Sequence, residues 1–217
     1  MTDLGVRTYD NAAVGRVVHG AGAFDSLADL LTERGARKVI IASTRSVIDG
    51  TDFVDRARAM LGARFAGLSD PIASHSPHDA LEALMRLGED TQCDAVVAIG
   101  GSSVTDAAKV ASLRIAGGAP ELMLRNGAID DSGWAPVTRQ VTLIHVPTTL
   151  SAGEYTNGGG YVEAGDRGKT IAVDDRHMAW AVILDPILTL ATPQDLWTSS
   201  AVKAVDPEFL RVLERAS

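Results

Sequence analysis

Hydrophobic and polar positions along the chain follow two alternating patterns. Short apolar runs rich in β-branched residues recur at 38–43, 94–99, 141–146 and 181–184. Such runs are typical of strands buried on both faces of a sheet. Segments with helical spacing of apolar residues lie at 24–33, 47–61, 78–92 and 104–116. Strands and helices that alternate with short connections predict an α/β fold with a parallel sheet and crossover helices.

Several boundaries carry local signals. Ser76-Pro77 and Thr192-Pro193 each place a hydroxyl side chain before a proline, so we expect helices to begin there with the hydroxyls as caps. The stretch 117–136 is rich in Gly, Asp and Pro, which favours a long irregular connection. After Pro186 the pattern reads as helical. We therefore expect a sheet domain over 1–185 and the beginning of a helical domain over 186–217.

Composition narrows the class of protein. The chain has 217 residues, of which 46% are hydrophobic and 22% charged, values typical of a globular protein. Its net charge of −8 argues against nucleic acid or an anionic membrane as a partner. The single cysteine, Cys93, excludes a disulfide framework and suits a reducing compartment. No apolar run is long enough to span a membrane or serve as a signal, so we expect a cytoplasmic protein.

A glycine turn follows the second of the buried runs. Gly100 and Gly101 lack the Cβ atom that would keep the backbone away from a ligand. A helix starting near Ser103 offers unpaired amides to an anion, so a diphosphate would fit there. The alternative is a capping box between Ser103 and Asp106, with glycines that only turn the chain. Both interpretations stay open.

A second polar loop follows the third buried run. Pro147, Thr148 and Thr149 begin it, and Glu154 lies further on. If the strands at 94–99 and 141–146 are neighbours, both loops meet at one edge of the sheet, and the threonine hydroxyls can donate to a shared ligand. The alternative is an ordinary turn in which the threonines bind the local backbone.

Residues 100–109 resemble the GGGS-x-x-D-x-x-K signature of the iron-containing alcohol dehydrogenase superfamily, with Ser102 in place of the third glycine. Residues 147–154 resemble its PTT-x-x-x-x-E loop, and 15–22 and 185–189 resemble its opening strand and its DP-x-LT junction. The short 147–154 loop and the motif His75-Ser76-Pro77 are most similar to the maleylacetate reductase branch.

This resemblance implies a Rossmann-like domain that binds NAD(H) or NADP(H), followed by a helical domain. It implies an oxidoreductase that transfers a hydride between the cofactor and a small carbonyl or enone, and we also expect a homodimer. The alternative is a cofactor-binding or dimerising module without catalysis of its own, because the helical domain is incomplete. The expected cofactor contacts are Thr44, Gly100, Gly101, Ser102, Ser103, Asp106, Thr148, Thr149 and Lys169, and the expected substrate-cleft residues are His75 and Lys203.

The segment after the first buried run bears on cofactor choice. Ala42-Ser43-Thr44-Arg45 carries no carboxylate to accept from the adenosine ribose. NADP is therefore admissible, and NAD is not excluded. Arg45 is either a phosphate contact or a solvated surface charge.

The resemblance also implies where metal-dependent relatives carry an aspartate and a histidine. Those positions are occupied here by Lys203 and Pro207. Neither residue supplies the expected ligand, so no metal ion is expected from this chain.

Overall fold

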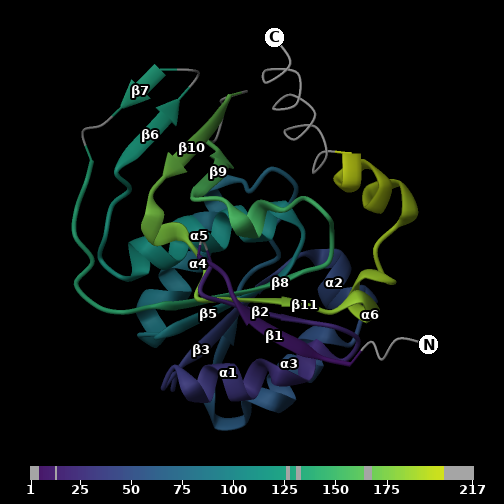
Figure 1. Ribbon diagram of the computed structural model, residues 1–217. Helices are drawn as coiled ribbons and strands as arrows, with labels where there is room; N and C mark the ends of the chain where they lie inside the picture. Colours follow the sequence, from purple (N-terminus) through teal and green to yellow (C-terminus); the bar gives the residue numbers. More distant parts are fainter. Residues whose placement is uncertain (1–4, 13, 126–127, 131–132, 164–167, 203–217) are drawn as a thin grey trace.

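A seven-stranded sheet lies at the centre of the molecule (Figure 1). The computed structural model describes residues 5–12, 14–125, 128–130, 133–163 and 168–202. The sheet has the strand order β1-β2-β11-β8-β5-β3-β4. Its strands are β1 (Arg7–Asp10), β2 (Arg16–His19), β3 (Val39–Ser43), β4 (Phe65–Leu68), β5 (Ala95–Gly100), β8 (Thr142–Pro147) and β11 (Ala181–Leu184). Only β1 runs antiparallel to its neighbour; the other pairs are parallel.

The central strands form where the apolar runs predict them, because both faces of the sheet are covered. Successive residues of a strand point to opposite faces. Val39 and Ile41 belong to the core on one face, whereas Ile40 and Ala42 belong to the core on the other. All five residues of β3 are buried, which explains why its sequence is continuously apolar up to Ser43 rather than alternating.

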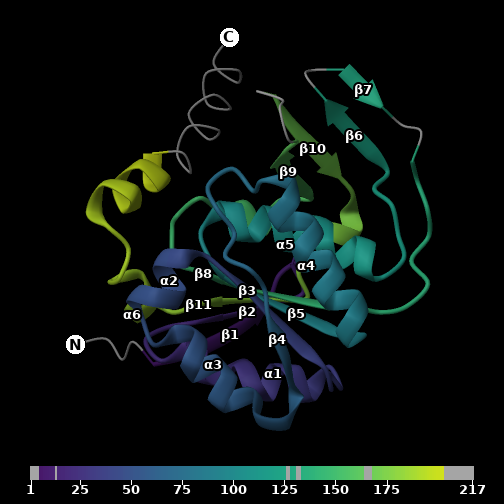
Figure 2. The same ribbon diagram turned by 180° about the vertical axis from the view of Figure 1, so that it is seen from behind.

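Helices cover the two faces in pairs (Figures 1 and 2). The helices α1 (Leu27–Glu33) and α3 (Phe53–Leu61) pack on one face, and α4 (His78–Thr91) and α5 (Ser102–Ile115) pack on the other. The short 3₁₀ turn η1 (Ala23–Ser26) precedes α1. These helices and the sheet confirm the α/β class.

The single helix predicted over 47–61 is wrong, since two helices occupy this segment. The helix α2 (Arg45–Gly50) ends at Thr51, whose backbone is extended, and α3 starts at Phe53. Glycine followed by a β-branched residue has low helix propensity. The Thr51 hydroxyl also donates to the Val47 carbonyl at 2.7 Å and accepts from the Phe53 amide at 3.3 Å, which stabilises the break.

A second, four-stranded antiparallel sheet lies beyond α5 (Figure 1). It contains β6 (Leu122–Arg125), β7 (Ala128–Asp130), β9 (Gly158–Val162) and β10 (Lys169–Val173) in the order β7-β6-β10-β9. The irregular connection expected over 117–136 is therefore wrong for β6 and β7. Both strands are short and carry little buried surface, so neither leaves a clear apolar pattern in the sequence; β6 is fixed by pairing with β10, and β7 by pairing with β6.

The chain after β11 is helical where it is described. The helix α6 (Pro186–Thr189) begins behind Asp185, whose carboxylate accepts from the Ile187 amide at 3.0 Å. A further helical segment covers 194–202. Within the described residues, no helix is long and apolar enough to cross a bilayer.

Two predicted caps are wrong, although helices do begin nearby. No side chain caps α4, because the Ser76 hydroxyl donates instead to the Ser103 carbonyl at 2.7 Å. The Thr192 hydroxyl donates to the Thr148 carbonyl at 2.6 Å. Both hydroxyls therefore connect distant segments to the loops at the carboxyl ends of β5 and β8.

Candidate functional site

The glycine turn lies between β5 and α5, at the carboxyl edge of the central sheet. Gly100 has a φ of 154°, and a Cβ atom there would lie 2.9 Å from Cγ2 of Val104. The helix begins at Ser102 behind Gly101, and no side chain caps it. The first amides of a helix have no acceptor within the helix. The uncapped turn therefore presents donors and a positive helix end to an anion.

The capping box between Ser103 and Asp106 is wrong, because α5 starts one residue before Ser103. The Ser103 hydroxyl accepts from the His75 amide at 3.0 Å. The Asp106 carboxylate pairs with Lys169 at 2.9 Å. Neither side chain occupies the amides of the first turn.

The two threonines lie beside the glycine turn, because β5 and β8 are parallel neighbours with Gly100 opposite Pro147. The Thr148 amide donates to the Gly100 carbonyl at 3.0 Å. A Cβ atom on Gly101 would lie 3.1 Å from Cγ2 of Thr149. The expected convergence of the two loops is therefore confirmed, and both threonines are buried against the turn.

A cleft of about 860 Å³ opens over these loops. One wall comes from the sheet side, with Thr44, Gly101, Ser102, Ser103, Thr148 and Thr149 among its residues. The other wall comes from Leu188, Thr192, Leu196 and Ser200 on the helical segment after β11. The Ser200 hydroxyl accepts from the Leu150 amide at 3.0 Å. The sequence predicts a helical segment beside the cleft but does not identify these four residues, because no local pattern indicates where the segment folds back.

Thr44 and Arg45 lie at the end of the cleft formed by β3 and α2. The Thr44 hydroxyl accepts from the Val47 amide at 3.4 Å, so it caps α2. Arg45 lines the cleft, is well exposed and lies 3.7 Å from Asp49 one turn later. An exposed ion pair of this kind leaves the guanidinium available to a phosphate.

The loop before α4 brings His75 close to the glycine turn. His75 and Ser76 both have positive φ values, of 66° and 51°. The His75 side chain is exposed, while its amide and the Ser76 hydroxyl bind Ser103. Ala73 and Ser74, rather than His75, are among the residues that line the cleft.

Asp106 and Lys169 form an ion pair beside the cleft rather than in its lining. The stem of Lys169 lies across β9, where a Cβ atom on Gly160 would overlap it. The Lys169 side chain is 42% exposed, whereas the Asp106 side chain is 14% exposed. The pair therefore links α5 to β10 and leaves the lysine accessible from one side.

A buried polar group of residues lies behind the cleft, around Lys109 of α5. Burial lowers the pKa of Lys109 to about 8, and burial together with the nearby Lys109 lowers that of His145 to about 3. Burial raises the pKa of Glu154 and lowers that of His177. Among the described residues, the buried side-chain atoms without a hydrogen-bond partner are both ring nitrogens of His145, Oε2 of Glu154 and Nε2 of His177. Lys109 and Glu154 belong to the two motifs found in the sequence, but the sequence does not place them together with His145 and His177.

The described residues offer no metal site, since no three His, Cys, Asp or Glu side chains come together among them. Lys203 and Pro207, the positions at which the resemblance implies ligands, lie outside the described residues. Lys203 therefore also has no described place in the substrate cleft. No step involving a metal ion follows from the residues present.

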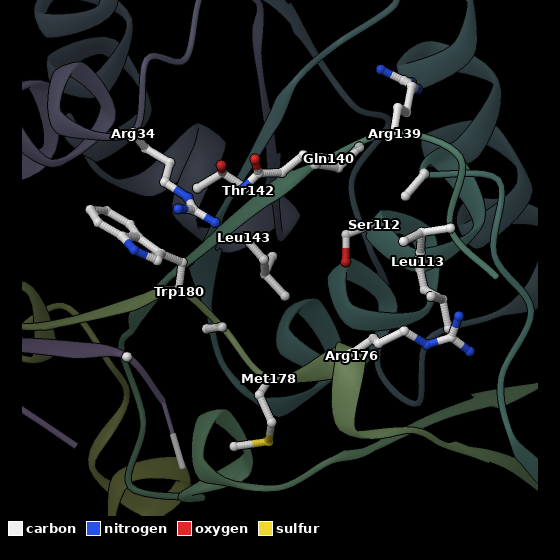
Figure 3. Close-up of a pocket in the computed structure, with 15 residues that line it drawn as sticks. Arg34, Ser112, Leu113, Arg139, Gln140, Thr142, Leu143, Arg176, Met178 and Trp180 are labelled. Carbon is white, nitrogen blue, oxygen red and sulfur yellow. The ribbon is translucent and has the colours of Figure 1, made fainter. Parts of the chain in front are cut away.

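A second cavity of about 460 Å³ lies at the opposite, amino-terminal edge of the sheet (Figure 3). Figure 3 shows Arg34 beside Trp180, with Arg139 and Arg176 across the cavity. Arg34 lies 5.6 Å from the centre of the Trp180 ring. Arg139 donates to two main-chain carbonyls, and Arg176 binds Asp174 and two further carbonyls. These arginines make structural contacts at this edge of the sheet. We therefore assign no ligand to the cavity.

Comparison with known proteins agrees with this geometry. Residues 15–186 match the family described as iron-containing alcohol dehydrogenase. A dehydrogenase of Alternaria alternata is 34% identical over 79% of this chain and 45% of its own length. Maleylacetate reductase 1 of Cupriavidus pinatubonensis is 30% identical over 88% of this chain and 46% of its own length. The chain thus spans about half the length of the curated relatives it matches.

Solved structures show the same fold. The maleylacetate reductase of Agrobacterium tumefaciens matches with a TM-score of 0.68 and 24% identity, over 88% of this chain and 47% of that chain. The sulfoacetaldehyde reductase of Bifidobacterium kashiwanohense, solved in complex with NAD⁺, matches with a TM-score of 0.75 and 19% identity, over 92% of this chain and 51% of that chain. At these identities the structures establish the α/β, Rossmann-like fold. The family match over residues 15–186 and the sequence relatives show that this chain belongs to the iron-containing alcohol dehydrogenase family of oxidoreductases.

Proposed function

We propose that this chain binds NAD(H) or NADP(H) in the cleft at the carboxyl edge of the sheet. The uncapped start of α5 behind Gly101, flanked by Thr148 and Thr149, is the observation that carries the proposal. Backbone amides at Ser102 and Ser103 would hold the diphosphate. The adenosine half would extend toward Thr44, and the nicotinamide half toward the threonines.

Binding of reduced cofactor tests this assignment directly. We expect NADH or NADPH to bind saturably, with a change in nicotinamide fluorescence. Ser102→Asp adds a negative charge where the diphosphate would lie, so it should weaken binding roughly tenfold or more. The same carboxylate is favourable at a helix start and should not destabilise the fold. Ser102→Ala keeps the backbone donors and is the matched control. Equal binding by all three proteins would contradict the assignment.

Arg45 supports a second step of the proposal, namely that NADPH is accepted. Its guanidinium lines the adenosine end of the cleft, and no carboxylate follows β3 there. Arg45→Ala should weaken NADPH more than NADH if the arginine contacts the 2′-phosphate. Equal effects on both cofactors would assign Arg45 to the solvated surface.

The reaction that we propose is transfer of a hydride between NAD(P)H and a small carbonyl or enone substrate, as in the maleylacetate reductases that the chain resembles. The cofactor supplies the hydride when bound, and the chain orients the nicotinamide. His75 and Lys203 remain predicted substrate-cleft residues. Oxidation of NADH or NADPH that depends on added maleylacetate would support the proposal. Saturable cofactor binding without oxidation would favour the alternative, a cofactor-binding module without catalysis of its own.

We also propose that the chain forms a homodimer. The edge strand β1 is exposed at all four residues and pairs only with β2 among the described strands. A strand at the edge of a sheet can pair with a strand of a second chain. Light scattering that gives twice the chain mass would support the dimer, and the mass of one chain would contradict it.

A further inference from the structure

Lys109 lies in the third turn of α5, and its side chain is completely buried. Its ammonium donates to the carbonyls of Gly153, Thr156 and Gly158 at 2.5, 2.6 and 3.1 Å, and the Thr156 hydroxyl lies 3.0 Å away. All four acceptors belong to 153–158, the segment that joins η3 (Gly153–Tyr155) to β9. One side chain thus contacts four oxygens of this segment.

The longer stretch from Thr149 to β9 approaches α5 closely at both ends. A Cβ atom on Gly159 would lie 2.9 Å from the Asp106 carbonyl, so β9 touches the backbone of α5 there. At the other end, Gly101 abuts the Thr149 side chain. Between these two contacts, the hydrogen bonds of Lys109 join α5 to the same stretch of chain. The segment from Thr149 to β9 therefore follows α5 along two of its turns.

We propose that Lys109 is a positioning residue for the cofactor site: it fixes the segment after β8 against α5, so that Thr148 and Thr149 stay aligned with the glycine turn. This inference rests on the proposed function. Loss of the ammonium would remove one donor from each of the Gly153, Thr156 and Gly158 carbonyls and would break the link between this segment and α5, so the segment would shift away from the helix. The glycine turn has contacts besides those with the threonines, because Ser103 also binds the loop before α4.

This division predicts different effects on two ligands. NADH spans the glycine turn and the threonines, whereas ADP contacts only the turn and the adenosine end. Lys109→Met removes the donors and keeps most of the length of the side chain. We expect it to weaken NADH roughly tenfold or more, and ADP less than about threefold. A general loss of structure would weaken both ligands equally.

The wild-type protein offers a second test. Groups that face the ammonium are Asp106 on α5, Glu154 on η3, Lys169 on β10, His145 on β8 and His177 on η4 (Asp175–His177). Burial brings the pKa of Lys109 down to about 8, and the neutral amine has one fewer donor. The ratio of the NADH to the ADP dissociation constant should therefore rise as the pH increases from 7 to 9.5.

The closing experiment titrates NADH and ADP into the wild type, Lys109→Met and Lys38→Met. Lys38 also donates to a carbonyl, that of Thr91, but at the amino-terminal edge of the sheet. We expect only Lys109→Met to weaken NADH binding selectively. If that variant does not fold, the pH dependence of the two dissociation constants of the wild type tests the role of Lys109 instead. Equal losses of both ligands, no loss, or a flat pH series would overturn the role of Lys109. Failure of the wild type to bind either nucleotide would overturn the proposed function itself.

Discussion

His145→Leu should remove a large part of the protein's sensitivity to mild acid. His145 lies in the middle of β8 and has no exposed surface. Its neighbours Ile144 and Val146 face the core under α1 and α3, so the imidazole faces the opposite side, toward α5. Neither ring nitrogen has a hydrogen-bond partner. Leucine has nearly the same volume and brings no polar atom.

The size of the effect follows from the pKa of the imidazole. Burial and the nearby Lys109 lower it from 6.5 to about 3 in the folded protein. The unfolded chain then binds the proton more tightly, so the stabilisation is complete above pH 6.5 and is lost as the pH falls toward 3. The loss is about 1.36 kcal/mol per pH unit, or ~2 kcal/mol between pH 6.5 and 5.

Urea unfolding between pH 7.5 and 5 measures this effect. The free energy of unfolding of the wild type should fall by about 2 kcal/mol more than that of His145→Leu. Because His177 remains in both proteins, its contribution cancels in the difference. At pH 7.5 the variant should be at least as stable, since two unsatisfied nitrogens are gone. His75→Leu, which removes an exposed imidazole, is the control. Parallel pH curves for the wild type and His145→Leu would refute the reasoning.

Three further predictions concern the surroundings of the site. Burial raises the pKa of Glu154 above its ordinary 4.5, so the folded state is destabilised as the pH rises above 4.5 and the carboxyl ionises. In thermal unfolding, Glu154→Gln should therefore lose less stability than the wild type between pH 4 and 7. Asp106→Asn and Lys169→Met should show a coupling of about 0.5–1 kcal/mol in a double-mutant cycle, because the pair is partly exposed, and simple additivity would disprove it. Gly159→Ala should lower the free energy of unfolding by about 1–3 kcal/mol, because the added Cβ pushes β9 away from α5. Gly158→Ala, whose Cβ would make an ordinary 3.6 Å contact, should lower it by less than about 0.5 kcal/mol. Equal losses of stability would show that β9 does not approach α5 tightly at Gly159.

The central sheet was predictable because burial on both faces leaves a direct mark on the sequence. β3, β5, β8 and β11 each coincide with an apolar run. The convergence of the glycine turn and the threonine loop followed from one further rule, that parallel neighbours end at the same edge. The residues that carry the proposed site are thus readable from local patterns.

Other features depend on contacts that no local pattern encodes. β6 is a strand because β10 pairs with it, and 51 residues separate Leu122 from its partner Val173. Ser76 has the sequence context of a cap, yet its hydroxyl reaches Ser103 on another helix. The four acceptors of Lys109 come from a segment that begins 44 residues later. Tertiary packing overrides local preference at each of these positions.

The most direct test of the account is a fluorescence titration of the purified 217-residue chain with NADH and NADPH, performed in parallel on Ser102→Asp. The account predicts saturable binding of at least one reduced cofactor by the wild type, and binding weakened roughly tenfold or more by the added carboxylate. Absence of saturable binding, or equal binding by the wild type and the variant, would contradict the assignment of the cleft to the cofactor.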